Sequence, residues 1–179
     1  MEFNDVLSFW FDDIEPSSWW LKSDDFDALI KSKFLTVHTR ANNGELYEWR
    51  SSAAGRLAEI IVLDQFSRNI FRDTPRAFSS DPLALVLAQE TISQGLHQEL
   101  TPIQRSFLYM PYMHSESLII HDAGLKLYEE NGIQSNIDFE IKHRDIIERF
   151  GRYPHRNTIL NRKSTSDEIA FLKQPNSSF

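Results

Sequence analysis

The chain has 179 residues, of which 41% are hydrophobic, and its formal net charge is −7. This length and composition are typical of a globular protein with a sizeable core, and they exclude an intrinsically disordered chain. The acidic charge disfavours nonspecific binding to nucleic acid or to anionic membranes. The absence of cysteine excludes disulfides, thiolate nucleophiles and cysteine-based zinc sites.

The first residues and the longest apolar stretches bear on localisation. Residues 1–5 lack the basic region with which a signal peptide begins. The longest apolar stretches, at 60–63 and 118–120, are far too short to cross a bilayer. We therefore expect a soluble cytoplasmic protein with no membrane partner and no nucleic-acid partner.

Hydrophobic periodicity predicts helices through the first half of the chain. A short apolar segment at 5–11 is interrupted by Pro16. Asp24 is expected to cap a helix whose apolar residues share one face, and this helix should end at the Asn-Asn-Gly break of residues 42–44. A longer helix is predicted over residues 53–71.

Cap signals divide the middle of the chain in the same way. Asp81-Pro82 and Thr101-Pro102 each combine an N-cap residue with a proline at the first helical position. Gly95 is expected to end the first of these two helices. The second pattern runs over residues 103–130, and Pro111 should kink it or split it into two helices.

The last part of the chain also reads as helical. A helix is predicted from about 138 to 150, and Thr165 with Glu168 forms a capping box for a short last helix. The tail from about residue 174 is expected to fray. No segment alternates like a half-buried strand, and no linker divides the chain. We therefore predict a single all-α domain over residues 1–179, made of antiparallel helix pairs.

Asp64 and Arg68 are the most informative residues, because they stand where a core helix should be apolar. A stripe at helical spacing begins at Ala53 and reaches Ile61, and the two charged residues continue it. Buried charge is costly unless it is paired and hydrogen-bonded. The pair is either a structural tether between helices or part of a polar functional site. The other candidates on this segment are Gln65, Asn69 and Arg72.

A second polar segment follows Pro111. If the helix resumes there, His114 and His121 share one face, with Glu116 nearby. A metal site would need further ligands, usually from other helices at i, i+3 or i, i+4 spacing, and no His-Glu-x-x-His motif occurs. We therefore expect no metal, and we interpret His114 as a hydrogen-bonded core histidine.

A third segment, residues 149–157, concentrates positive charge in an acidic protein. Arginine suits bidentate binding of carboxylate or phosphate. These arginines either neutralise Asp64 and Glu116 or form an anion pocket, and a nucleic-acid patch is disfavoured by the overall charge. The candidate residues are Arg149, Arg152, His155, Arg156 and Asn157.

Together these segments resemble the bacterial Domain of Unknown Function 924 family, nearly from end to end. The matching motifs are Val6–Phe11, Trp19-Trp20 with Phe26-Asp27, Leu63–Arg72, Ala77-Phe78 with Asp81, Phe107–Glu116, Arg149–Asn157, and Ser164-Thr165 with Glu168. Ser67, Tyr153 and Asn161 depart from the usual proline, phenylalanine and glycine, but no charged residue is lost. The resemblance implies an all-helical fold packed as a tetratricopeptide-like right-handed superhelix, and it implies no reaction.

The sequence favours a binding protein for a small anionic ligand or a peptide partner. The alternatives are an enzyme acting on a phosphate- or carboxylate-bearing substrate, and a scaffold whose ion pairs are purely structural. No nucleophile–base–orienter set, P-loop or dinucleotide fingerprint can be found, which favours binding and predicts no cofactor. An exposed apolar groove would indicate a partner, whereas a pocket lined by arginine, histidine and carboxylate would indicate a small ligand.

The sequence predicts one polar cluster and one group of aromatic core residues. The three polar segments should converge into one cluster, because each carries charge that another can neutralise. Its predicted members are Asp64, Gln65, Arg68, Asn69, Arg72, His114, Glu116, Arg149, Arg152, His155, Arg156 and Asn157. The N-terminal aromatic residues should pack in the core rather than hold a cofactor. They are Phe9, Trp10, Phe11, Trp19 and Trp20.

Overall fold

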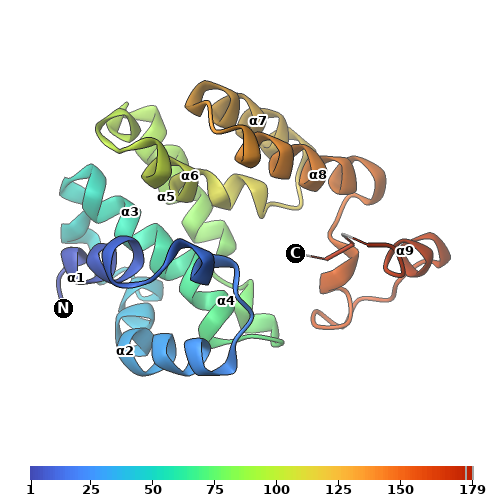
Figure 1. Cartoon of the computed structure of the whole chain (residues 1–179), viewed down its shortest axis with the longest axis horizontal. Helices are drawn as coiled ribbons and strands as arrows, with labels where there is room; N and C mark the ends of the chain where they lie inside the picture. Colours follow the sequence, from blue (N-terminus) through green and yellow to red (C-terminus); the bar gives the residue numbers. More distant parts are fainter. Residues whose placement is uncertain (176, 179) are drawn as a thin grey trace.

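The structure is a computed structural model that describes residues 1–175 and 177–178. Within these residues the regular elements are all helical and no strand occurs, which confirms the all-α prediction (Figure 1). The α-helices are α1 (Phe3–Ser8), α2 (Asp24–Asn42), α3 (Ala53–Ile61), α4 (Ser67–Ile70), α5 (Asp81–Ser93), α6 (Pro102–Met113), α7 (Leu118–Asn131), α8 (Gln134–Phe150) and α9 (Ser166–Phe171).

Shorter helical turns connect these helices. Two are π-helical, η1 (Phe9–Asp13) and η4 (Val62–Phe66). The others are 3₁₀ turns, namely η2 (Pro16–Trp20), η3 (Tyr47–Ser51), η5 (Pro75–Ala77), η6 (Leu96–Glu99) and η7 (Pro154–Arg156).

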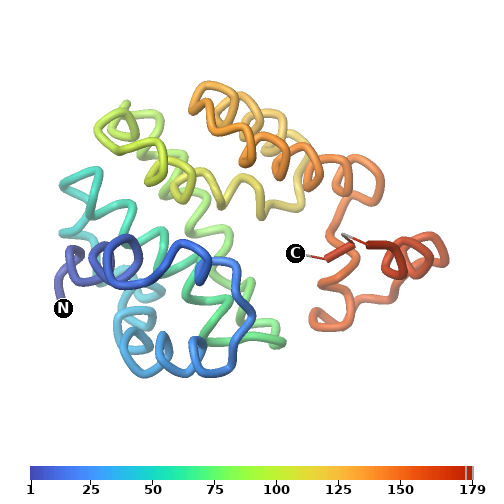
Figure 2. The backbone as a smooth tube through the Cα atoms, in the orientation of Figure 1, coloured from blue at the N-terminus to red at the C-terminus, as the bar shows by residue number. Residues whose placement is uncertain are grey.

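Neighbouring helices pack in sequence through most of the molecule. Helix α3 contacts α1 and α5, and α2 packs against α4 and η4. Helices α5, α6, α7 and α8 then pack each against the next. Figure 2 shows the chain continuing from α8 into a C-terminal segment that includes α9 and lies to one side of the earlier helices. The tetratricopeptide-like superhelix and the single domain stay predictions.

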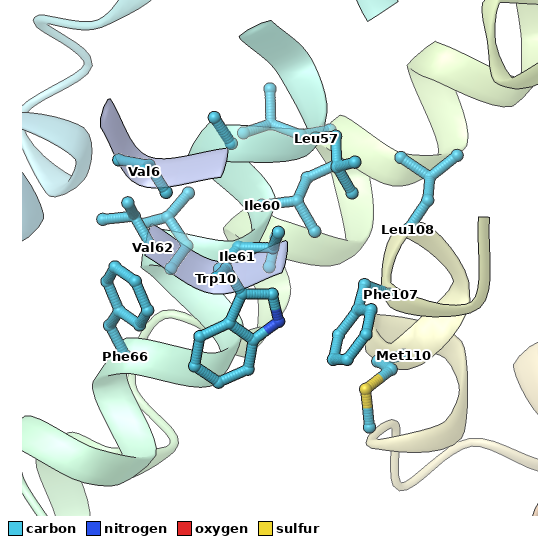
Figure 3. Close-up of a cluster of buried hydrophobic side chains, with 14 of the residues drawn as sticks. Val6, Trp10, Leu57, Ile60, Ile61, Val62, Phe66, Phe107, Leu108 and Met110 are labelled. Atoms are coloured by element: carbon cyan, nitrogen blue, oxygen red, sulfur yellow. The ribbon is translucent and has the colours of Figure 1, made fainter. Parts of the chain in front are cut away.

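The main core is formed by residues of α1 to α7 and of the turns between them. A smaller apolar cluster lies where α8 meets the C-terminal segment. Trp10 is buried in the main core against the rings of Phe66 and Phe107 (Figure 3). The expectation that the N-terminal aromatics are core residues is correct for Phe9 and Trp10. It is wrong for Trp20, which is 62% exposed, although its ring stacks on Phe107 at a centroid distance of 6.1 Å and meets the ring of Trp19 edge-on at 6.5 Å.

The helix predicted over residues 53–71 is present, but a π-helical turn interrupts it. Helix α3 ends at Ile61, η4 spans Val62–Phe66, and α4 completes the segment. A π-turn contains an extra residue and changes the direction in which the following side chains point. Asp64 lies within this turn, so its position differs from that of a regular helix.

Two of the predicted N-caps are wrong by one residue. The N-caps are Ser23, whose hydroxyl accepts a hydrogen bond from the backbone N–H of Phe26, and Ser80. Asp24 and Asp81 are instead the first helical residues, where negative charge suits the helix dipole. Because its carboxylate is not engaged in capping, Asp81 is available for pairing with other elements.

Pro111 does not divide the helix at its own position. It lies inside α6, which continues to Met113, and α7 begins only at Leu118. His114 is therefore the C-cap of α6 and not a member of α7, so the prediction that it shares a helical face with His121 is wrong.

The other cap signals agree with the structure. Thr101 and Thr165 form capping boxes, and Gly132 and Gly151 adopt the left-handed conformation directly after α7 and α8. Helix α8 starts at Gln134, four residues before the predicted start.

Part of the tail predicted to fray lies outside the described residues. Within the described part, the Ser177 hydroxyl donates a hydrogen bond to the Leu172 carbonyl at 3.2 Å. No helix among the described residues is both long enough and apolar enough to cross a membrane.

Candidate functional site

Asp64 lies at the centre of the most highly connected polar group in the fold. Its side chain is 1% exposed. His114 Nδ1 lies 2.8 Å from Oδ1, and Gln65 Nε2 donates to Oδ2 at 2.5 Å. Arg68 Nη1 lies 3.3 Å from Oδ1, one helical turn further along. The buried carboxylate therefore has several donors, as a buried charge requires.

These donors determine the charge of Asp64. Burial acts to raise the pKa of this carboxyl, but the positive charge of Arg68 and the hydrogen bonds from His114 and Gln65 outweigh it, so that the pKa lies well below its usual range. Asp64 is therefore ionised at neutral pH.

Arg68 connects Asp64 to a second carboxylate that the sequence did not suggest as a site residue. Its two terminal nitrogens each donate to a different oxygen of Asp81 at 3.1 Å, and Nη1 also donates to the Asp64 carbonyl at 2.7 Å. This fork-like contact is the strong geometry for a guanidinium and a carboxylate. It links α4 to the first turn of α5.

Arg156 approaches the same carboxylate from the C-terminal segment. Its Nη1 lies 3.5 Å from Asp81 Oδ2, and its guanidinium carbon lies 4.5 Å from the ring centroids of both Phe78 and Tyr153. The residue is 6% exposed, and its Nε has no hydrogen-bond partner among the described residues. Burial lowers the pKa of Arg156, and the nearby charge of Arg68 adds to this effect.

We call Asp64, Arg68, Asp81, His114 and Arg156 the polar site. Its members come from η4, α4, α5, the end of α6 and η7, so segments distant in sequence meet in it. The side chains of three members are partly exposed, with 20% for Arg68, 15% for Asp81 and 12% for His114. The polar site is therefore a largely buried ion-pair network with three partly exposed members.

His114 has one ring nitrogen engaged and one available. Because the Asp64 carboxylate is ionised, Nδ1 carries the hydrogen of their 2.8 Å contact. Nε2 makes no hydrogen bond with the described residues. Burial lowers the pKa of His114 and Arg68 adds to this, while Asp64 opposes it, and the pKa lies below the ordinary value. At neutral pH Nε2 is thus an unprotonated acceptor.

Asn69 and Arg72 belong to a different ion pair. Both bind Asp27 on α2, with 2.8 Å from Asn69 Nδ2 to Oδ1 and 2.7 Å from Arg72 Nη2 to the same oxygen. A second contact joins Arg72 Nε to the other carboxylate oxygen. These residues tie α4 and the turn after it to α2, and among the described residues their side chains make no hydrogen bond with the polar site.

Glu116 lies beside the polar site but has its own partners. Arg162 donates to it through Nη1 at 2.5 Å and Nη2 at 2.8 Å, and the backbone N–H of Tyr153 donates at 2.8 Å. Burial acts to raise the pKa of Glu116, but the hydrogen bonds from Arg162 and Tyr153 lower it below its usual range. This contact holds the chain just before η7 in place.

The remaining residues of segment 149–157 are distributed over other contacts. Arg152 pairs with Glu168, Arg149 lies over the rings of Phe150 and Phe171, Asn157 binds Arg162 and Ser164, and the ring of His155 lies 5.4 Å from that of Tyr153. Burial and the charge of Arg156 lower the pKa of His155 to about 4. Within the described part of the chain, Arg156 is the one of these three arginines that belongs to the polar site.

Sequence reasoning missed Asp81, Phe78, Tyr153 and Arg162. Asp81 was interpreted only as a helix cap, although it belongs with Phe78 to one of the motifs that carry the family resemblance. Tyr153 likewise stood inside a motif. Its hydroxyl donates to the Met113 carbonyl at 2.5 Å, which fixes η7 against the end of α6. Arg162 carried no local signal.

His121, which the sequence placed near His114, makes its own contacts away from the polar site. His121 contacts Glu140 at 2.7 Å and the Ser115 carbonyl at 2.8 Å. Among the described residues, no group of three or more histidine, aspartate or glutamate side chains is arranged to hold a metal ion. Two surface recesses of about 440 and 210 Å³ lie along α7, α8 and α9, away from the polar site.

The fold and the site together define a small all-helical protein with an ion-pair network between its middle helices and its C-terminal segment. The family described as "Bacterial protein of unknown function (DUF924)" matches residues 6–176, and the chain belongs to this family. A solved structure of a protein of unknown function from Agrobacterium tumefaciens is 36% identical, covers 96% of each chain and superposes with a TM-score of 0.91. No curated protein matches the chain.

Proposed function

We propose that the polar site binds the carboxylate or phosphate group of a small molecule. The observation that carries this proposal is the setting of Arg156. Its guanidinium is buried and lies over two aromatic rings, yet the one ion pair that it makes among the described residues, to Asp81, is 3.5 Å long. A buried guanidinium normally has its donors satisfied.

The sharing of Asp81 strengthens the proposal. Arg68 already holds both oxygens of this carboxylate at 3.1 Å, so Arg156 receives only the remainder of its hydrogen-bonding capacity. The two guanidinium groups also repel each other, which contributes to the lowered pKa of Arg156. An additional anion beside them would relieve this repulsion and accept the unused donors.

The exposure of the site limits the kind of ligand. Solvent reaches the polar site through Arg68, Asp81 and His114, and neither surface recess borders it. A ligand would therefore place one anionic group against these partly exposed residues and leave much of its remaining surface in water.

Thermal unfolding in the presence of inorganic phosphate and of succinate tests the proposal. A ligand that binds only the folded protein at 100 times its Kd stabilises it by about 2.7 kcal/mol, and the melting temperature should rise accordingly. Arg156→Gln should abolish the rise. Arg144→Gln removes the same charge from α8, where Arg144 pairs with the exposed carboxylates of Asp122 and Glu148, and this variant should keep the rise.

Direct titration calorimetry of the three proteins controls for differences in basal stability. The proposal is contradicted if wild-type protein shows no heat of binding with either anion. It is also contradicted if Arg156→Gln binds them as tightly as Arg144→Gln.

A further inference from the structure

We infer that His114 is a general base oriented by Asp64, and that the polar site hydrolyses a carboxylic ester whose anionic end is held by Arg156. This inference rests on the proposed function and adds a reaction to it. Asp64 is a positioning residue in this scheme, because it acts only through His114.

The geometry of the imidazole supports this role. The C-cap position at the end of α6 places His114 beside the π-turn, where Asp64 accepts a hydrogen bond from Nδ1 at 2.8 Å. The buried carboxylate is itself held by Gln65 and Arg68, so the ring orientation is fixed from behind. Nε2 makes no hydrogen bond with the described residues and belongs to a side chain that is 12% exposed.

The charges around the ring keep this nitrogen basic but unprotonated at neutral pH. Arg68 and burial disfavour the imidazolium, while Asp64 and Asp81 favour it, and the pKa of His114 lies below the ordinary value. A base must be unprotonated before the reaction and stabilised once it has taken a proton. The neighbouring carboxylates provide the second condition.

Water is the nucleophile that fits the site. The chain has no cysteine, and no serine or threonine hydroxyl is hydrogen-bonded to His114 within the described residues. An imidazole that lacks a side-chain nucleophile can still remove a proton from a water molecule placed between it and a carbonyl carbon.

The reaction balances without any further reactant. The oxygen of water forms a bond to the ester carbonyl carbon while His114 Nε2 takes one of its protons, and the carbonyl electron pair moves onto oxygen. The guanidinium of Arg68, partly exposed beside His114, supplies positive charge for this oxyanion. When this tetrahedral intermediate collapses, the bond between the carbonyl carbon and the alkoxide oxygen breaks. The alkoxide oxygen receives the proton from Nε2. The products are a carboxylic acid and an alcohol.

Two activated esters test the inference. Mono-4-nitrophenyl succinate carries a free carboxylate, whereas 4-nitrophenyl acetate does not, and release of 4-nitrophenol is followed by absorbance. Wild-type protein should prefer the succinate ester, and Arg156→Gln should remove the preference. His114→Gln should lower the rate by about a hundredfold or more, within the range for loss of a general base. His97→Gln, which changes a half-buried histidine on η6, should leave the rate unchanged.

Asp64→Asn separates positioning from a purely structural role. It should lower kcat with little change in KM, and the pH–rate profile of wild-type protein should rise with a midpoint below pH 6.5. The inference is overturned if His114→Gln, checked to be folded, retains wild-type hydrolysis, or if wild-type protein shows no hydrolysis above that variant. If succinate still stabilises the protein in that case, only the hydrolytic step fails. If no anion binds, the proposed function fails as well.

Discussion

At the scale of single residues, Asp64 shows how a buried carboxylate makes stability depend on pH. Its pKa in the folded protein lies below the unfolded value of about 3.9, so its ionised form stabilises the fold above that pH. This contribution is lost as the pH falls through the folded-state pKa. Asp64→Asn should therefore weaken the dependence of unfolding free energy on pH below about 4.

Urea unfolding at a series of acidic pH values would measure this effect. Asp122→Asn serves as the control, because the Asp122 side chain is 52% exposed although it pairs with Arg144. Equal acid sensitivity of Asp64→Asn and the wild type would show that Asp64 does not carry the effect.

The tryptophans offer a contrast between a core residue and an exposed one. Trp10 is 1% exposed and contacts Phe66 and Phe107, so Trp10→Ala should destabilise the fold by about 3–5 kcal/mol. Trp20→Ala removes two ring contacts, with Phe107 and Trp19, from a residue that is 62% exposed, so it should cost much less. Chemical denaturation of both variants checks the difference, and similar losses would contradict the assignment of Trp10 to the core.

Residue-level patterns reveal the charged groups but not their partners. Asp64 and Arg68 were recognisable because they interrupt an apolar stripe, and burial then required a polar neighbour. Asp27 and Asp81 stand in the first turns of helices, where carboxylates are common without any tertiary role. Their pairing with Arg72 and Arg68 depends on how α2 and α5 pack, which local sequence does not determine.

At the scale of helices, boundaries follow local chemistry wherever only one residue can serve as the cap. Thr101 and Gly151 are such cases. Where serine precedes aspartate, as at Ser23-Asp24, either residue can cap, and the structure selects the serine. The π-turn at η4 could not be anticipated, because Val62–Phe66 has the apolar spacing of an ordinary helix.

Close approach of helices makes Gly124 sensitive to a single methyl group. A Cβ at this position of α7 would lie 2.9 Å from Cβ of Tyr112 and 3.4 Å from Oε1 of Glu140. Alanine favours helix over glycine, yet Gly124→Ala should destabilise the protein by about 1–3 kcal/mol through overpacking.

The destabilisation caused by Gly55→Ala can be compared with that caused by Gly124→Ala. Its Cβ would lie 2.0 Å from the backbone oxygen of Trp49, which cannot rotate away. It should therefore cost more than Gly124→Ala in thermal and chemical unfolding. A stabilised Gly124→Ala variant would mean that α7 can move away from α6 at little cost.

At the scale of the whole molecule, the two apolar clusters predict unequal local stability. The main core involves α1 to α7, whereas the cluster at the C-terminal segment has three buried members, Ile146, Ile147 and Tyr153. Native-state hydrogen exchange should therefore show lower protection in α9 than in α3 or α6. Uniform protection along the chain would contradict this prediction and indicate a single cooperative unit.

The sharing of Asp81 between two arginines has a consequence for selectivity. A carboxylate tethered within the fold has a high effective concentration, so under the proposed function an external anion would bind beside Asp81, through the donors of Arg156 that this carboxylate leaves unused. Its binding would place a second negative charge next to that of Asp81, and the two anions would repel each other. Asp81 would thus disfavour anions that bind Arg156 weakly.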